Sequence, residues 1–97
     1  MKTLDEVKKI LAEHREELRQ KYKVKEIGVF GSFVRGKQKK TSDIDILVEF
    51  DESVGLFEFM DLEEYLGKLL GARVDLVSRG ALKPGIGERV LKEVIYP

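Results

Sequence analysis

The fold is decided by a stretch that reads GSFVRG over residues 31–36 and, after a short basic segment, TSDIDILV over residues 41–48. This pattern predicts the end of a strand, a glycine–serine turn, one turn of helix, a loop and a second strand. Because side chains alternate between the two faces of a strand, Asp43 and Asp45 are expected to share one face while aliphatic side chains take the other. The stretch therefore predicts two adjacent carboxylates on the strand face opposite to the one that packs into an aliphatic core.

The residue types in this stretch point to a metal-bound nucleotide. Two neighbouring carboxylates repel each other and favour a hard divalent cation. Gly31 and Ser32 offer backbone N–H groups and a hydroxyl to a phosphate. The basic segment at residues 37–40 is either a solvated turn or a group that attracts a triphosphate.

A third carboxylate lies in the second half of the chain, where residues 73–77 read RVDLV and predict a strand. An aspartate among aliphatic residues is unfavourable without a partner. Asp75 therefore has two interpretations. It forms a salt bridge with Arg73 or Arg79, or it is a third metal ligand beside the first two carboxylates.

The rest of the chain predicts helices that cover a sheet. Apolar residues at helical spacing predict helices over residues 4–22, 56–70 and 88–95, and a buried strand is expected over residues 24–30. The first helix begins with a capping-box pattern, and a glycine ends the second.

Four residues on these elements have both a structural and a functional interpretation. His14 is expected to make a hydrogen bond at the edge of the first helix, since the chain has no second histidine to complete a metal site. Gly28 indicates either close backbone approach or simple tolerance of glycine in a strand. Phe57 and Tyr65 lie off the main apolar stripe and could contact a partner.

Composition limits the class of protein. The chain has 97 residues, 42% of them hydrophobic, with 18 basic and 18 acidic residues and no cysteine. This favours one globular domain over residues 1–97, and the zero net charge argues against general nucleic-acid or membrane-surface binding. Since neither a membrane span nor a signal peptide is visible, we expect a cytoplasmic protein.

The run GSFVRGKQKKTSDIDILV over residues 31–48 resembles the signature of the DNA polymerase beta-type nucleotidyltransferase superfamily. With VDLV at residues 74–77, the whole chain is similar to the minimal nucleotidyltransferases, the small MntA-like antitoxins. The sequence departs from that pattern at Val34, where the family commonly has alanine, and at its tail, which ends without a later helix.

The resemblance implies an α/β (α+β) fold, a small mixed sheet with helices on one face and the active site on the other. It implies Mg²⁺-dependent transfer of AMP from ATP to a hydroxyl, with two Mg²⁺ ions held by Asp43, Asp45 and Asp75. The residues expected to bind the nucleotide are Gly31, Ser32, Arg35, Lys40 and Ser42. From the residues alone, Arg35 could instead tie the short helix to a carboxylate, and Ser42 could be a turn hydroxyl.

The resemblance also implies a partner, a HEPN-domain toxin that the chain neutralises as an antitoxin by placing AMP on a tyrosine. Two alternatives stay open at this stage. The chain could neutralise its partner by binding alone, or it could transfer the nucleotide to a small molecule or an RNA end. The sequence leaves the oligomeric state open.

Overall fold

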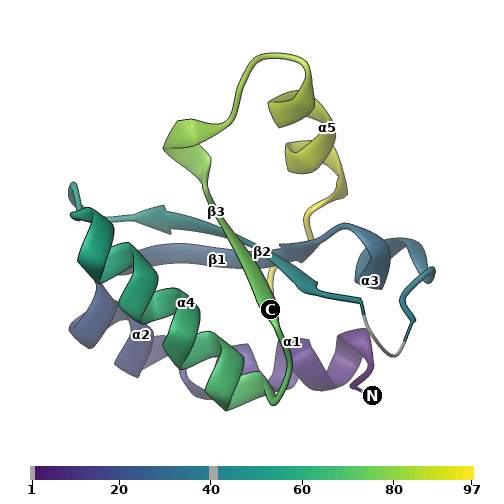
Figure 1. The fold of residues 1–97 in the computed structure, drawn as a ribbon, viewed down its shortest axis with the longest axis horizontal. Helices are drawn as coiled ribbons and strands as arrows, with labels where there is room; N and C mark the ends of the chain where they lie inside the picture. Colours follow the sequence, from purple (N-terminus) through teal and green to yellow (C-terminus); the bar gives the residue numbers. More distant parts are fainter. Residues whose placement is uncertain (1, 40–41) are drawn as a thin grey trace.

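The computed structural model describes residues 2–39 and 42–97, which form a sheet with helices on both of its faces (Figure 1). In chain order the elements are α1 (Leu4–Glu13), α2 (Arg15–Tyr22), β1 (Val24–Phe30), α3 (Ser32–Arg35), β2 (Ile44–Phe50), α4 (Leu56–Leu70), β3 (Val74–Ser78), the 3-10 turn η1 (Arg79–Ala81) and α5 (Ile86–Glu93). No helix within the described ranges is long and apolar enough to cross a membrane.

The sheet is mixed, with β2 in the centre. Strand β1 pairs with β2 in the antiparallel sense, and β3 pairs with β2 in the parallel sense. The outer edge of β1 is joined by the chain after α5, where Val29 and Ile95 exchange backbone hydrogen bonds of 2.9 and 2.8 Å. The C-terminal segment is thus attached to the sheet.

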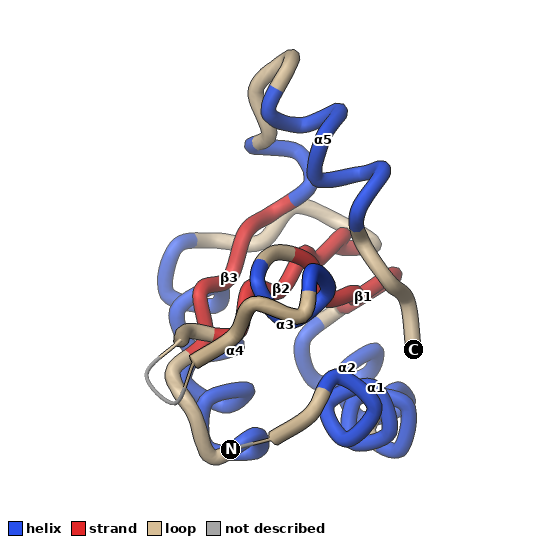
Figure 2. The backbone as a smooth tube through the Cα atoms, turned by 90° about the vertical axis from the view of Figure 1, so that its right-hand side faces the viewer, coloured by secondary structure: helices blue, strands red, loops and turns tan. Residues whose placement is uncertain are grey.

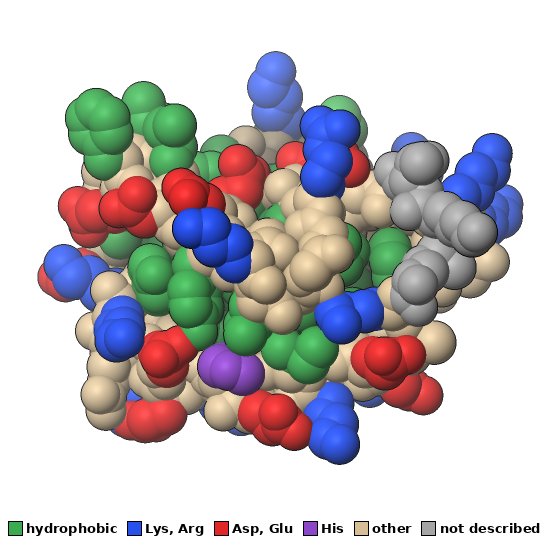
Figure 3. Space-filling view, turned by 60° about the horizontal axis from the view of Figure 1, so that its bottom comes forward, with side chains coloured by type: hydrophobic (Ala, Val, Ile, Leu, Met, Phe, Trp, Pro, Cys, Tyr) green, Lys and Arg blue, Asp and Glu red, His purple; other side chains and the backbone are tan. Residues whose placement is uncertain are grey.

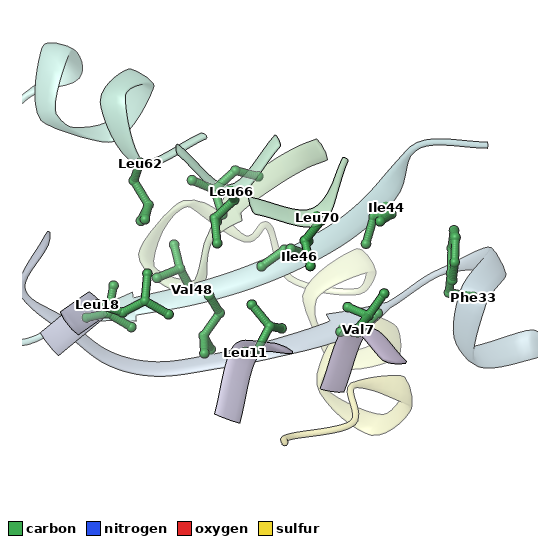
Figure 4. Close-up of a cluster of buried hydrophobic side chains, with 14 residues drawn as sticks. Val7, Leu11, Leu18, Phe33, Ile44, Ile46, Val48, Leu62, Leu66 and Leu70 are labelled. Atoms are coloured by element: carbon green, nitrogen blue, oxygen red, sulfur yellow. The ribbon is translucent and has the colours of Figure 1, made fainter. Parts of the chain in front are cut away.

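Helices α1, α2 and α4 cover one face of the sheet, as Figure 2 shows. The strand residues that alternate toward this face are aliphatic, as the period of two requires, and the helices contribute residues at three- and four-residue spacing. The side chains in Figure 4 form this core, whose largest fully buried members are Val7, Leu11, Leu18, Val29, Ile44, Ile46, Val48, Leu62, Leu66 and Leu70.

Helix α5 lies on the opposite face of the sheet (Figures 1 and 2). It packs through Val90 and Val94 against Leu47, which points away from the main core. The expected helical layer is therefore confirmed for α1, α2 and α4. Helix α5 departs from the expectation of helices on one face, because Val90 and Val94 cover Leu47 and add a small second layer on the other side.

Element boundaries follow the sequence closely, with one break. The predicted helix over residues 4–22 is divided at His14, which ends α1, and the ring Nδ1 lies 2.9 Å from the Ile10 carbonyl oxygen. The expected hydrogen bond of His14 is thus confirmed. The break separates Val7 and Leu11 from Leu18, yet all three side chains are fully buried on the same core.

Two of the open sequence interpretations are resolved, and the partner contact of Phe57 stays a prediction. A Cβ atom added to Gly28 would lie 2.6 Å from Val94 Cγ2, so this glycine marks a close approach. Tyr65 belongs to the interior edge, because its ring lies 5.1 Å from that of Tyr22. Phe57 is 80% exposed. On the face in Figure 3, acidic and basic side chains are interspersed, in keeping with the balanced composition.

Candidate active site

The predicted site residues meet where the end of β1 lies beside the starts of β2 and β3. In the strand register Phe30 pairs with Asp45, and Asp45 pairs with Asp75. Gly31 follows β1 directly, so the glycine–serine turn begins next to both carboxylates. All of this lies on the face away from α1, α2 and α4, because Ile44, Ile46 and Leu76 take the core side.

Gly31 is required by its surroundings. Its backbone has φ 78° and ψ −148°, a conformation that is essentially restricted to glycine. A Cβ atom at this position would overlap the carboxylate of Asp45. The turn therefore brings backbone next to the acidic site as closely as a chain can approach.

Asp45 is the electrostatic centre of the site. Burial, the neighbouring carboxylates of Asp75 and Asp43, and a hydrogen bond with Asp75 raise its pKa to about 6, against the opposing charge of Arg35. Asp45 thus retains a proton more readily than an ordinary aspartate. A bound cation would replace that proton and relieve the repulsion.

Asp43 is less engaged with the pair. It lies just before β2, is half-exposed, and its Oδ1 is 3.7 Å from Nε of Arg73. Arg79 pairs with Glu49 at 3.2 Å, so neither arginine fulfils the salt-bridge interpretation of Asp75. The third-carboxylate interpretation matches the placement of Asp75 beside Asp45.

The donors fit Mg²⁺ in kind, since carboxylate oxygens are its preferred ligands. Within residues 2–39 and 42–97, however, no three acidic, histidine or cysteine side chains are arranged as a ready metal cluster. The strand register supplies Asp45 and Asp75 together. Asp43 would complete the set by rotating away from Arg73, whose side chain is 89% exposed.

Beside the carboxylates is a hollow of about 300 Å³ lined by residues of β1, α3, β2 and α5. Gly31 and Arg35 line this hollow. We call the N–H of Gly31 and the guanidinium of Arg35 the phosphate cradle, because both are predicted to bind the phosphates of the nucleotide. Both bind Glu93 of α5, at 2.9 Å from Oε2 and 2.7 Å from Oε1. The interpretation of Arg35 as a tie to a carboxylate thus describes this structure, and the carboxylate is that of Glu93.

The other predicted nucleotide ligands are placed less favourably or lie outside the structure. Ser32 begins α3 directly after Gly31 and is half-buried. The hydroxyl of Ser42 accepts a 2.8 Å hydrogen bond from the N–H of Lys39, and Ser42 lines a different hollow, beside α1 and the end of α4. This geometry favours a turn role for Ser42. Lys40 lies outside the described residues.

A larger hollow, of about 1010 Å³, lies between the start of α4 and the end of β3. It is lined by residues such as Phe59, Leu76 and Arg79, and the three aspartates are not among them. We associate the predicted chemistry with the smaller hollow because Asp45 lines it together with Gly31 and Arg35, two of the residues predicted to bind phosphate.

Sequence reasoning missed two charged residues at this hollow, Arg89 and Glu93, both on α5. Their spacing of four places them on one face of a helix, which is a visible signal. That signal does not tell which part of the sheet the face meets, because the contacts join residues about sixty positions apart.

Comparisons with known proteins show the family of the chain. Residues 11–97 match the profile of the nucleotidyltransferase domain family. The chain is 56% identical over 96 residues to the protein adenylyltransferase MntA of Thermococcus cleftensis, covering 99% of this chain and 97% of that protein. A solved structure assigned as a minimal nucleotidyltransferase matches with a TM-score of 0.81 and 36% identity, over 97% of this chain and 95% of that one. A toxin–antitoxin structure with AMP-PNP matches with a TM-score of 0.74 and 27% identity, over 88% and 69%.

Proposed function

The chain belongs to the nucleotidyltransferase domain family, within its MntA-like minimal members, and from this premise we propose that it transfers AMP from ATP to a hydroxyl of a partner protein. The observation that carries the proposal is the alignment of Gly31, Asp45 and Asp75 on neighbouring strand ends. It brings the glycine–serine turn and two carboxylates to one point on the open face of the sheet.

In this proposal one group of site residues binds the phosphates of ATP, and the three aspartates bind metal ions and accept a proton. The N–H of Gly31, the hydroxyl of Ser32 and the guanidinium of Arg35 bind the phosphate tail of ATP. Asp43, Asp45 and Asp75 would hold two Mg²⁺ ions, which would neutralise the triphosphate and stabilise the attacking and leaving oxygens. Asp75, the exposed member of the paired carboxylates, accepts the proton of the incoming hydroxyl.

We further propose that the acceptor is a tyrosine of a HEPN-domain toxin and that the chain acts as its antitoxin. The family assignment supports this, as does the likeness to a toxin–antitoxin structure that contains AMP-PNP. The open position of the site supports a large acceptor, because the carboxylates lie at the surface rather than in a closed cavity.

One observation favours the alternative, in which binding alone neutralises the partner. Helix α4 exposes a strip of large apolar side chains far from the carboxylates, Leu56 at 70%, Phe57 at 80% and Met60 at 52%. Such a strip is a docking surface that needs no catalysis. The variant Asp43→Asn with Asp45→Asn separates the two, because under the alternative it protects cells as well as the wild type does.

The direct test incubates the purified chain with ATP labelled at the α-phosphate, Mg²⁺ and a HEPN-domain protein from the same organism. We expect label on the partner, its loss with EDTA, and a decrease of at least about 100-fold for Asp75→Asn. Asp61→Asn, an exposed aspartate of α4, is the matched control and should label normally. Absence of label on the partner with the wild-type chain would reject the transferase proposal.

A further inference from the structure

Glu93 uses both of its carboxylate oxygens on the groups that the proposed function assigns to ATP. Oε2 accepts from the Gly31 N–H at 2.9 Å, and Oε1 accepts from Nη1 of Arg35 at 2.7 Å. These distances are those of charge-assisted hydrogen bonds, and a phosphate uses the same kind of donors in the same forked way. Glu93 therefore occupies the phosphate cradle as an anion.

The surroundings of Glu93 show how strongly it is held. Burial raises its pKa, but the Gly31 N–H, the Arg35 guanidinium and the charge of Arg89 outweigh burial and keep the pKa below its usual value. The side chain is 21% exposed while that of Arg35 is 49% exposed. The carboxylate is thus ionised and bound, yet a rotation of its side chain toward solvent is open to it.

The same hollow cannot accommodate Glu93 and a triphosphate on the same donors. Asp45 already lines this hollow of about 300 Å³, so a phosphate placed there beside Glu93 would meet two carboxylates. The repulsion between negative charges that share so small a hollow is strong, because the site is partly desolvated. Either the phosphate or Glu93 can hold the N–H of Gly31.

Arg89 provides a place for the displaced carboxylate. It lies on α5 one turn before Glu93, and it also lines the hollow. Glutamate and arginine four residues apart on a helix are within reach of each other. The helix itself need not move, because Val90 and Val94 fix it on Leu47 and the chain after it is held by the pairing of Val29 with Ile95.

Resting on the proposed function, we propose that α5 is part of the nucleotide site. Glu93 competes with the triphosphate for Gly31 and Arg35, and on nucleotide binding it leaves the cradle and pairs with Arg89. Glu93 thus sets the affinity of the site for ATP without touching the reacting atoms, and it keeps Arg35 and Gly31 in position until the nucleotide arrives.

The test is calorimetric titration of the full chain with Mg²⁺ and AMP-PNP. Glu93→Gln keeps the shape of the side chain and removes its charge, so we expect binding about three- to tenfold tighter than in the wild type. Glu88→Gln, an exposed glutamate at the start of the same helix, is the matched control and should bind like the wild type. Glu93→Asp, which is too short to reach both donors, should also bind more tightly.

The role of Arg89 is tested by Arg89→Gln in two backgrounds. If Arg89 receives the displaced carboxylate, the substitution weakens AMP-PNP binding in the wild type and has no effect on Glu93→Gln. Equal weakening in both backgrounds would show that Arg89 contacts the nucleotide instead, which would overturn its assigned role.

The outcomes separate the two proposals. If the wild type binds AMP-PNP and Glu93→Gln binds no more tightly, Glu93 is a structural residue, and the competition fails while the proposed function stands. If Glu93 is purely structural, Glu93→Gln should lower the melting temperature without increasing the affinity for AMP-PNP. If neither chain binds AMP-PNP, the proposed function fails and the competition fails with it.

Discussion

Asp45 and Asp75 lie opposite each other on adjacent parallel strands, on the sheet face away from α1, α2 and α4, and the carboxylate of Asp75 helps to raise the pKa of Asp45. The pairing is enforced by the backbone register, so the two carboxylates cannot separate without disrupting β3. Their repulsion is therefore present in the folded chain whenever both are ionised. This makes the acidic site a source of instability that a cation or a proton removes.

The first prediction concerns the pH dependence of this instability. Because folding raises the pKa of Asp45 from 3.8 to about 6, the folded chain holds the proton more tightly than the unfolded chain. The contribution of this bound proton to the free energy of unfolding is complete below about pH 4 and is lost as the pH rises through about 6. Asp45→Asn should therefore raise the free energy of unfolding by about 1–2 kcal/mol at about pH 8, and by almost nothing at about pH 4.

Urea denaturation in EDTA at the two pH values measures this difference. Asp61→Asn provides the control, as an exposed aspartate of α4 remote from the site. A wild type that equals or exceeds Asp45→Asn in stability at the higher pH would contradict the coupling of Asp45 and Asp75.

The second prediction is that Mg²⁺ with ATP raises the melting temperature. A ligand that binds only the folded chain at 100 times its dissociation constant stabilises it by about 2.7 kcal/mol. For a domain of this size that corresponds to a rise of roughly 10 °C. Differential scanning fluorimetry with Mg²⁺ alone, ATP alone and both together checks it. The double variant Asp43→Asn with Asp45→Asn should show no rise, and an unchanged wild-type curve at saturating Mg-ATP would count against a nucleotide site.

The third prediction compares two glycines in the left-handed region. Gly31 has φ 78° and the Asp45 carboxylate against it, whereas Gly36 has φ 70° and open space around it. Gly36→Ala should cost about 1 kcal/mol of stability from backbone strain alone. Gly31→Ala should cost about 3 kcal/mol and should also abolish AMP-PNP binding. Chemical denaturation and calorimetry measure both, and equal losses of stability would show that the contact with Asp45 is not restrictive.

The strands, and the shared strand face of Asp43 and Asp45, were accessible to sequence reasoning because they depend on local rules. The alternation in residues 43–48 fixes which side chains face the core, and Gly71, with φ 65°, ends α4 where a glycine C-cap is expected. β1 and α4 accordingly have the predicted limits. β3 begins one residue later than expected and α5 two residues earlier, which is the usual uncertainty at element ends.

The position of α5 beside the site could not be predicted from local sequence patterns. Val90 and Val94 predict an amphipathic helix, but either face of a three-stranded sheet could have covered them. Which face they cover is decided by Leu47, a strand residue that points away from the main core, and by the pairing of Val29 with Ile95. The contacts of Glu93 follow from that choice. The ion pair of Asp43 with Arg73 is likewise a contact between segments that no local pattern joins.

The last prediction tests whether the C-terminal segment fixes α5. A Cβ atom on Gly28 would lie 2.6 Å from Val94 Cγ2 and 3.1 Å from the carbonyl oxygen of Ile95. Since that oxygen is backbone and is already bound to Val29, it cannot yield without loss of the pairing. Gly28→Ala should therefore destabilise the chain by about 1–3 kcal/mol.

Amide hydrogen exchange locates this loss of stability. In Gly28→Ala the amides of Val29 and Ile95 should exchange faster than those of the β2–β3 pairing, because the outer edge of β1 opens first. Gly80→Ala, whose nearest neighbouring atom lies 4.0 Å away, is the control and should leave both stability and exchange unchanged. If Gly28→Ala matches this control, the C-terminal segment rests on β1 without holding α5. In that case Val90 and Val94 on Leu47 are sufficient to keep Glu93 over the cradle.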